Sequence, residues 1–262
     1  MQDAEVQTEN KVLNIEIPAI PVVIQKVLNV LENPHANANI IAANVARDPG
    51  LSAKILGVAN SAFYGFSHKI TSLPQAIMIL GLNALKGILV TLALLEKEYS
   101  KKVKKTIVNL WQHLTRSAYI AKEVAISLNF KNKSDIITAA LLHDIGKAII
   151  ALNFPEKTLE IEKLKKEKNM NSIEAEKEIL GFSHEEVNFL LCEKWSLSNF
   201  IKYPLSFHHR VNQTENFVKE IAFIHFVDAI ANKIEPQSEA LEILGISEAK
   251  KEEIIWKVEF GK

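Results

Sequence analysis

The sequence contains very little cysteine and no excess of charge of either sign. Cys192 is the one cysteine among 262 residues, so a disulfide cannot form within the chain, as is usual for proteins of a reducing compartment. Lys plus Arg and Asp plus Glu number 31 each, whereas a nucleic-acid-binding protein usually carries a marked basic excess. We therefore expect a cytoplasmic protein that has no nucleic-acid partner.

A signal peptide and a convincing membrane span are also missing. Residues 1–14 are largely polar, which is unlike a secretory signal and predicts a disordered tail. The most apolar stretch, residues 76–95, is interrupted by Asn83, Lys86 and two glycines. A buried helical hairpin accommodates such residues better than a bilayer does, so we expect a soluble protein.

Glycine is scarce too, with nine in the chain, and helix interiors mostly avoid glycine. Apolar residues make up 48% of the sequence and recur at spacings of three and four, without a convincing run of period two. This pattern predicts an all-helical fold with a sizeable core. The predicted helices span residues 22–31, 37–47, 51–61, 72–81, 83–98, 106–128, 134–143, 156–168, 173–180, 184–195, 199–208, 218–234 and 248–262.

Three features mark boundaries or breaks within these helices. Ser134 or Asp135 would cap the helix over 134–143, and Gly146 would end it with a left-handed cap. Pro204 is expected to kink or interrupt the helix over 199–208. Residues 97–105 contain five lysines, which fit either a basic patch for an anionic ligand or a solvated linker between two lobes, and the pattern favours the linker.

Histidine and aspartate gather in the second half of the chain. Six of the eight histidines lie there, most of them in apolar, helical surroundings, namely His113, His143, His184, His208, His209 and His225. Asp144 and Asp228 lie in similar surroundings, where an ionised carboxylate is costly unless it is paired or binds a metal. Imidazole and carboxylate groups suit Fe, Mn, Co, Ni or Zn.

Any one of these histidines is most simply a residue whose hydrogen bonds are satisfied within the protein. The adjacent pairs His143-Asp144 and His208-His209 and the order of the whole set favour a shared site instead. Helical bundles build such sites from side chains that point inward from several helices. Neighbouring residues lie about 100° apart on a helix, so His143 and Asp144 can face one pocket only near a helix end.

Several segments resemble known families. Residues 141–147 (LLHDIGK) resemble the signature of HD-domain metal-dependent phosphohydrolases, and the chain from about 17 to 234 more closely resembles the HDOD (HD-related output) domain. The HDOD matches are residues 47–49 (RDP), 59–65 (ANSAFYG), 80–82 (LGL), 176–187 (EKEILGFSHEEV) and 195–197 (WSL). This resemblance implies an all-helical protein of bacterial signal transduction, with an N-terminal helical lobe (15–105) packed on an HD-like metal-binding lobe (106–262).

The resemblance also implies a set of site residues. His113, His143, Asp144 and Asp228 match the basic metal ligands of the HD pattern. Further positions match the HD-GYP branch, which hydrolyses cyclic di-GMP. His184, His208 and His209 match additional metal ligands of that branch, and Lys147 matches its lysine that faces the phosphate. The Gly-Tyr-Pro element of that branch is replaced here by residues 210–214 (RVNQT), and Asn188 stands where many HDOD proteins have glycine.

Two functions follow from this set. The first is a regulatory or output module that keeps an HD-like metal site and acts on a signalling protein or nucleotide. The alternative is an active phosphohydrolase for a nucleotide or cyclic nucleotide, with one or two divalent transition metal ions and with Asp144 and Lys147 as catalytic residues. Asn60, Phe63 and Tyr64 are candidates for partner recognition, although aromatic residues in this loop could equally join the two lobes.

Overall fold

The computed structural model describes residues 15–17, 19–33, 35–61, 69–95 and 97–260. The described part is helical and contains no strand, as the spacing of apolar residues predicts. The predicted disordered tail and two of the candidate partner residues, Phe63 and Tyr64, lie outside the described residues.

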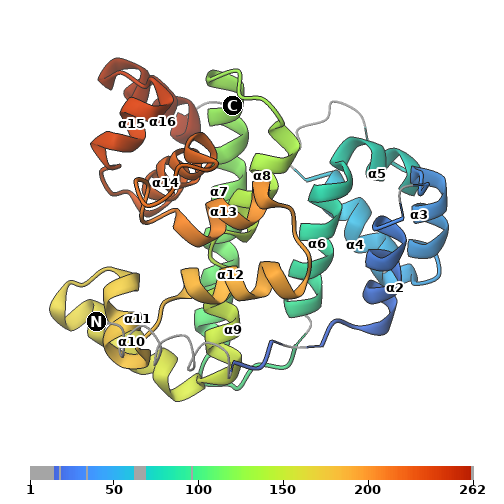
Figure 1. Cartoon of the computed structure of the whole chain (residues 1–262), viewed down its shortest axis with the longest axis horizontal. Coiled ribbons are helices and arrows are strands. Elements are labelled where there is room, and N and C mark those ends of the chain that lie inside the picture. Colours follow the sequence, from blue (N-terminus) through green and yellow to red (C-terminus); the bar gives the residue numbers. More distant parts are fainter. Residues whose placement is uncertain (1–14, 18, 34, 62–68, 96, 261–262) are drawn as a thin grey trace.

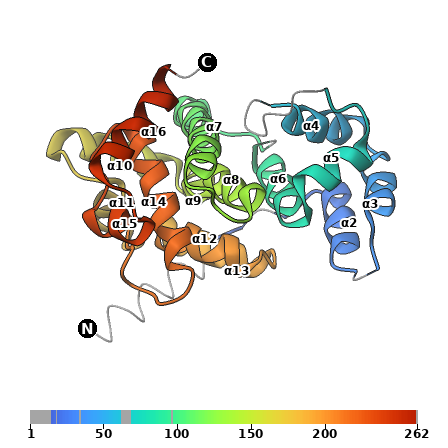
Figure 2. The same cartoon turned by 90° about the horizontal axis from the view of Figure 1, so that it is seen from above.

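Five helices form the N-terminal part of the fold and lie together on one side of the molecule (Figure 2). They are α2 (Val22–Leu31), α3 (Ala38–Val45), α4 (Pro49–Ala59), α5 (Leu73–Leu80) and α6 (Leu82–Leu95). Polar side chains begin three of them: Asn37 accepts the N–H groups of two residues of α3, and Asp48 and Ser72 each accept one N–H. These caps satisfy donors that a helix leaves unpaired at its start.

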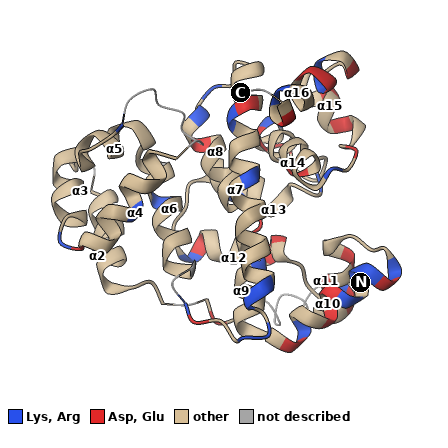
Figure 3. Cartoon of the chain, turned by 180° about the vertical axis from the view of Figure 1, so that it is seen from behind, with Lys and Arg blue, Asp and Glu red and all other residues tan. Residues whose placement is uncertain are grey.

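The remaining helices form a larger bundle (Figure 1). They are α7 (Lys104–Ser127), α8 (Lys133–Leu142), α9 (Ile145–Asn153), α10 (Pro155–Lys168), α11 (Ser172–Leu180), α12 (His184–Lys194), α13 (Asn199–Phe207), α14 (Val218–Asn232), α15 (Ser238–Leu244) and α16 (Glu248–Phe260). The long helix α7 packs against α8, α14 and α16, while α12 packs against α9 and α13. Both signs of charge are interspersed along α10 and α11 (Figure 3).

The region around residue 146 differs from the sequence-based expectation. Gly146 does not end a helix with a left-handed cap: it lies inside α9, and its φ is not among the positive values of the described glycines. The helix α8 is preceded by Asn132 in the left-handed conformation (φ 53°) instead of being capped by Ser134 or Asp135. Helices α9 and α15 were not expected from the sequence. The chain therefore breaks at His143 and Asp144 and starts a second helix at once.

Pro204 does not interrupt its helix, because α13 runs from Asn199 to Phe207 without a break. Only five helical residues precede Pro204, so its missing N–H removes a single bond near the start of the helix. Among the described residues, no single helix is long and apolar enough to cross a bilayer. Residues Leu73–Leu80 and Ala84–Leu94 reach that length and composition only as a pair bent by 108°.

The two groups of helices meet where α6 packs against α8 and α9. Gly87 makes this close approach possible, because a Cβ atom there would lie 2.6 Å from Leu142 Cδ1 and 2.7 Å from Thr138 Cγ2. Leu142 is fully buried and directly precedes His143. The packing of α6 therefore fixes the position of the break between α8 and α9. The lobe boundary at residue 105 stays a prediction.

Two glycine substitutions test this close packing. Gly87→Ala is expected to lower the free energy of unfolding by about 1–3 kcal/mol, because the added methyl overlaps two buried side chains. Gly57→Ala is the matched control: Gly57 is also helical, but nothing lies within 4 Å of its Cβ position. That change should raise the unfolding free energy by about 0.5–1 kcal/mol, because alanine favours helix. Urea unfolding measures both, and equal effects would contradict the proposed contact.

Candidate metal centre

Seven predicted site residues converge on one place inside the larger bundle. His113 lies on α7, and His143 and Asp144 lie at the break between α8 and α9. His184 is the first residue of α12, His208 and His209 follow the end of α13, and Asp228 lies on α14. Figure 1 shows these helices gathered at the centre of the bundle. Segments that are distant in sequence thus contribute to a single cluster.

The first half of this cluster is the aspartate group, consisting of His113, His143, Asp144 and Asp228, whose ligand atoms all lie within 4.8 Å of one another. The Nε2 atoms of His113 and His143 lie 3.0 and 3.1 Å from Asp228 Oδ1 and 3.1 Å from each other. They lie 3.5 and 3.6 Å from Asp144 Oδ2.

The second half is the histidine group, consisting of Asp144, His184, His208 and His209, which meets the same 4.8 Å limit. Here the other oxygen of the shared carboxylate is used: Asp144 Oδ1 lies 3.1 Å from His184 Nε2 and 3.6 Å from His208 Nε2. The two oxygens of Asp144 therefore face two different sets of donors.

The histidine group has the properties expected of a metal site. Four of its atoms are buried and form no well-aligned hydrogen bond in the described part of the chain: Asp144 Oδ1 and the Nε2 atoms of His184, His208 and His209. Only the first two lie close enough to pair with each other, at 3.1 Å. Buried polar atoms are nearly always paired, so such a set calls for a ligand from outside the chain. Donors about 2.1 Å from one ion lie about 3.0–3.4 Å apart, close to the separations observed in both groups.

Hydrogen bonds at Nδ1 orient three of the imidazoles. His143 Nδ1 lies 2.8 Å from the carbonyl oxygen of Ala140, His184 Nδ1 lies 2.6 Å from Glu176 Oε2, and His208 Nδ1 lies 3.2 Å from the carbonyl oxygen of Leu205. Since each partner only accepts, Nδ1 carries a proton, and Nε2 is the nitrogen that points into the cluster and would bind a metal in exchange for any proton there. Such outer partners are typical of metal-binding histidines.

The pKa values of the two carboxyl groups reflect the positive charge around them. Burial would raise the pKa of Asp144, but Lys147, His143 and His184 hold it well below its usual range. Burial would likewise raise the pKa of Asp228, but hydrogen bonds from His113 and His143 hold it well below. Both carboxylates are therefore ionised at neutral pH and attract a cation.

The pKa values of the histidines differ according to the charges beside each ring. Burial lowers the pKa of His208, and burial together with His208 and His184 lowers that of His209 well below its usual range. Burial would lower the pKa of His184 as well, but Glu176 raises it to about 9. The buried Glu176 belongs to a segment that resembles HDOD proteins but was not among the predicted site residues. It both orients His184 and adds negative charge beside the cluster.

Asn188 joins three ligand-bearing segments through one buried side chain. Its Nδ2 donates to the carbonyl oxygens of His143 (2.5 Å) and Leu205 (2.8 Å), and its Oδ1 accepts the Gly146 N–H (2.7 Å). A Cβ on Gly146 would lie 2.5 Å from the His184 carbonyl oxygen and 2.8 Å from Asn188 Oδ1. Gly146 is therefore required for close contact between α9 and α12.

Two further candidates lie apart from the cluster or support it indirectly. His225 uses both ring nitrogens, since Nδ1 lies 2.8 Å from the His208 carbonyl oxygen and Nε2 accepts the Gln237 N–H at 3.0 Å, so it supports the backbone at His208. Asn60 bonds both the N–H and the carbonyl oxygen of Ile70 at 2.8 Å. Its side chain therefore joins the end of α4 to the backbone just before α5, and its role in partner recognition stays a prediction.

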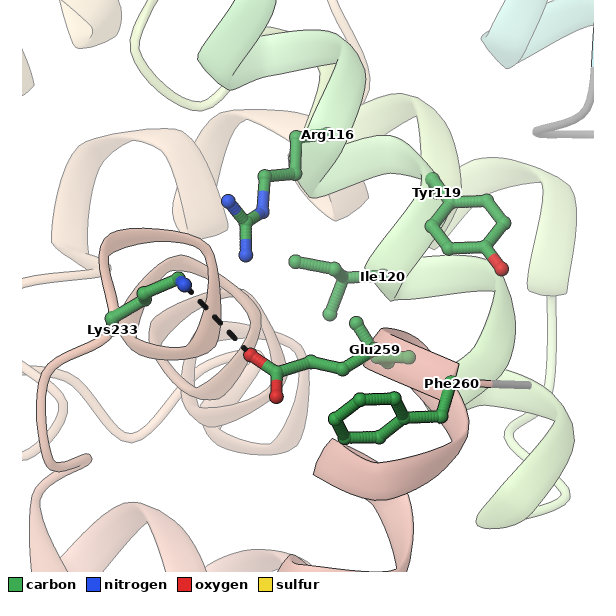
Figure 4. Close-up of a pocket in the computed structure, with 7 residues that line it drawn as sticks. Arg116, Tyr119, Ile120, Lys233, Glu259 and Phe260 are labelled. Atoms are coloured by element: carbon green, nitrogen blue, oxygen red, sulfur yellow. Dashed lines mark ion pairs between the residues drawn. The ribbon is translucent and has the colours of Figure 1, made fainter.

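A hollow of about 410 Å³ lies at α7, the end of α14 and α16, and none of the seven cluster residues lines it. Figure 4 shows Arg116 and Lys233 pointing into it, with Lys233 4.0 Å from the carboxylate of Glu259. Ile120 and Phe260 add apolar surface. This hollow is separate from the candidate metal centre.

Comparisons with known proteins agree with the fold. The family model of the HDOD domain matches residues 17–211. A proposed phosphohydrolase from Shewanella amazonensis SB2B is 22% identical, with 95% of this chain and 93% of that chain covered and a TM-score of 0.72. The solved structure of a proposed signal transduction protein from Marinobacter aquaeolei VT8 is 16% identical. The match covers 98% of this chain and 64% of that chain, with a TM-score of 0.69.

One curated relative also matches. An uncharacterized protein of Treponema pallidum (strain Nichols) is 22% identical over 222 residues, which are 81% of this chain and 43% of the relative. The chain thus spans less than half the length of that relative.

Asn188→Leu tests whether one side chain holds the ligand-bearing segments together. The change leaves the Gly146 N–H and two carbonyl groups unpaired in a buried place, so the free energy of unfolding measured in the presence of chelator should fall by about 3 kcal/mol. Asn44→Leu removes a bond to the Ile40 carbonyl oxygen at a more exposed position and should change it by less than about 0.5 kcal/mol. Similar losses in both variants would contradict the bridging role.

Proposed function

The chain belongs to the HDOD domain family, and on this premise we propose that it is a bacterial signal-transduction module built around a centre for one or two transition metal ions. The observation that carries the proposal is the convergence, within 4.8 Å, of four buried ligand atoms: Asp144 Oδ1 and the Nε2 atoms of His184, His208 and His209. A second donor set on the other side of Asp144 shares the same carboxylate.

The assignment of ligands follows the two groups. His113, His143 and Asp228 would hold one ion, His184, His208 and His209 would hold the other, and Asp144 would bridge them. Imidazole and carboxylate donors without cysteine suit Fe, Mn, Co, Ni or Zn. Because the ligands belong to separate helices, bound metal would stabilise their arrangement, since a ligand that binds only the folded state favours it. A partner protein or nucleotide would bind to the arrangement of helices that the metal stabilises.

Metal removal tests the centre. Protein purified without chelator is expected to contain at least one equivalent of a transition metal by elemental analysis. Chelation should lower Tm and metal return should restore it, since an ion at 100 times its Kd contributes about 2.7 kcal/mol. Asp144→Ala should abolish both effects, because Asp144 belongs to both groups.

His35→Ala is the control, since His35 lies on the N-terminal side outside both groups. It should keep the metal and the chelator response of the wild type. A metal-free wild type whose Tm ignores added metal would refute the proposal.

Phosphohydrolysis is the second candidate, and Lys147 is the observation that favours it. Lys147 Nζ lies 2.5 Å from Asp144 Oδ2, and the side chains of Lys147 and His113 are 25% and 17% exposed. The cluster is therefore reachable from solvent on this side. When bound, the ions would supply hydroxide near neutral pH by lowering the pKa of water toward about 7. Lys147 would stabilise negative charge on phosphate oxygens.

An activity panel separates the two candidates. Metal-loaded wild type and Asp144→Ala are each incubated with nucleoside phosphates and cyclic dinucleotides, and products are separated by chromatography. The regulatory proposal predicts no turnover above the Asp144→Ala background. Turnover by the wild type alone would make the chain an enzyme and replace the regulatory proposal.

A further inference from the structure

We propose that the two halves of the centre are not equivalent: the histidine group takes up the first metal ion, and Lys147 holds the aspartate group closed by acting as a built-in cation on Asp144 Oδ2. The inference rests on the proposed function, because it assumes that the centre binds metal. It adds an order of binding and names the residue that controls the second step.

The histidine group is ready to bind. Its four ligand atoms are buried and converge within 4.8 Å, and in the described part of the chain the Nε2 atoms of His208 and His209 have no hydrogen-bond partner. An ion entering this group replaces one contact, the 3.1 Å pair of His184 Nε2 and Asp144 Oδ1. It also gives a partner to the Nε2 atoms of His208 and His209, which burial has separated from water. Ligands held in place before binding cost the least to organise.

The aspartate group is different, because its metal-ligand atoms already contact one another or a neighbouring side chain. Asp228 Oδ1 accepts a hydrogen bond from Asn232 Nδ2 at 2.8 Å and lies 3.1 Å from His143 Nε2. The Nε2 atoms of His113 and His143 are themselves 3.1 Å apart, within hydrogen-bond distance. An ion entering here must replace these contacts, so the net gain is smaller.

Lys147 adds a competing positive charge on this side. Its ammonium lies 2.5 Å from Asp144 Oδ2, the oxygen that faces the aspartate group, and not from Oδ1. The contact is local, since Lys147 follows Asp144 by three residues in the first turn of α9. An ion in the aspartate group would share Oδ2 with the ammonium or displace it, and like charges on one oxygen repel.

Three consequences follow for metal uptake. The first equivalent should bind tightly and depend on His208, while the second should bind more weakly and depend on His113. Removing the charge of Lys147 should strengthen the second step and leave the first nearly unchanged. The centre is therefore a one-ion site that Lys147 keeps from becoming a two-ion site.

The test is a titration of the chelator-treated full chain with Co²⁺, followed by calorimetry and visible absorbance. Wild type should bind one equivalent tightly and a second at least tenfold more weakly. In Lys147→Met the Kd of the second should fall at least tenfold, while that of the first changes less than threefold. Lys165→Met is the matched control, because Lys165 also pairs with a carboxylate three residues away, at 3.2 Å, and is 29% exposed.

Substitutions of single ligands show which group binds the tight ion and which binds the weak ion. His208→Gln should remove the tight equivalent, and His113→Gln should remove only the weak one, with circular dichroism and Tm of the metal-free variants checking the fold. Equal affinities in wild type, an unchanged second step in Lys147→Met, or loss of the tight ion in His113→Gln alone would overturn the inference while leaving metal binding intact. Failure of wild type to bind Co²⁺ at either group would instead overturn the proposed function, and the inference with it.

Discussion

The structure depends on keeping the charged carboxylate of Asp144 inside a helical bundle. Burying an ionised carboxylate is costly unless positive or hydrogen-bonding groups surround it, and here Lys147 and imidazoles from separate helices do so. The carboxylate lies at the break between α8 and α9, where its two oxygens can face opposite groups of ligands. Every functional statement about this chain follows from that shared position.

The scaffold is arranged to hold this break in place. On an unbroken helix, His143 and Asp144 would point about 100° apart, but the end of α8 allows both to face the centre. The missing side chains of Gly87 and Gly146 let α6 and α12 approach from two sides. Asn188 then binds backbone groups of the neighbouring segments. Small residues and one amide thus set the positions of the ligands through contacts with the backbone.

Much of this was predictable from the sequence, because it depends on local signals. Apolar spacing predicted the course of α2 and α12. In the structure Ser183 and Glu186 start α12 at His184. The ligand set followed from residue types and from the family resemblance. The roles of Gly146, Asn188 and Glu176 were not predictable, since each depends on contacts between segments distant in sequence. Helix α9 was missed for a related reason: it begins directly at the break, and Gly146 indicated an end.

The most direct measurement is anomalous diffraction from crystals of protein prepared without chelator. The account predicts a strong anomalous peak about 2.0–2.2 Å from Asp144 Oδ1 and from the Nε2 atoms of His184, His208 and His209. Well-ordered density for these four side chains with only water between them, in protein supplied with transition metals, would contradict it.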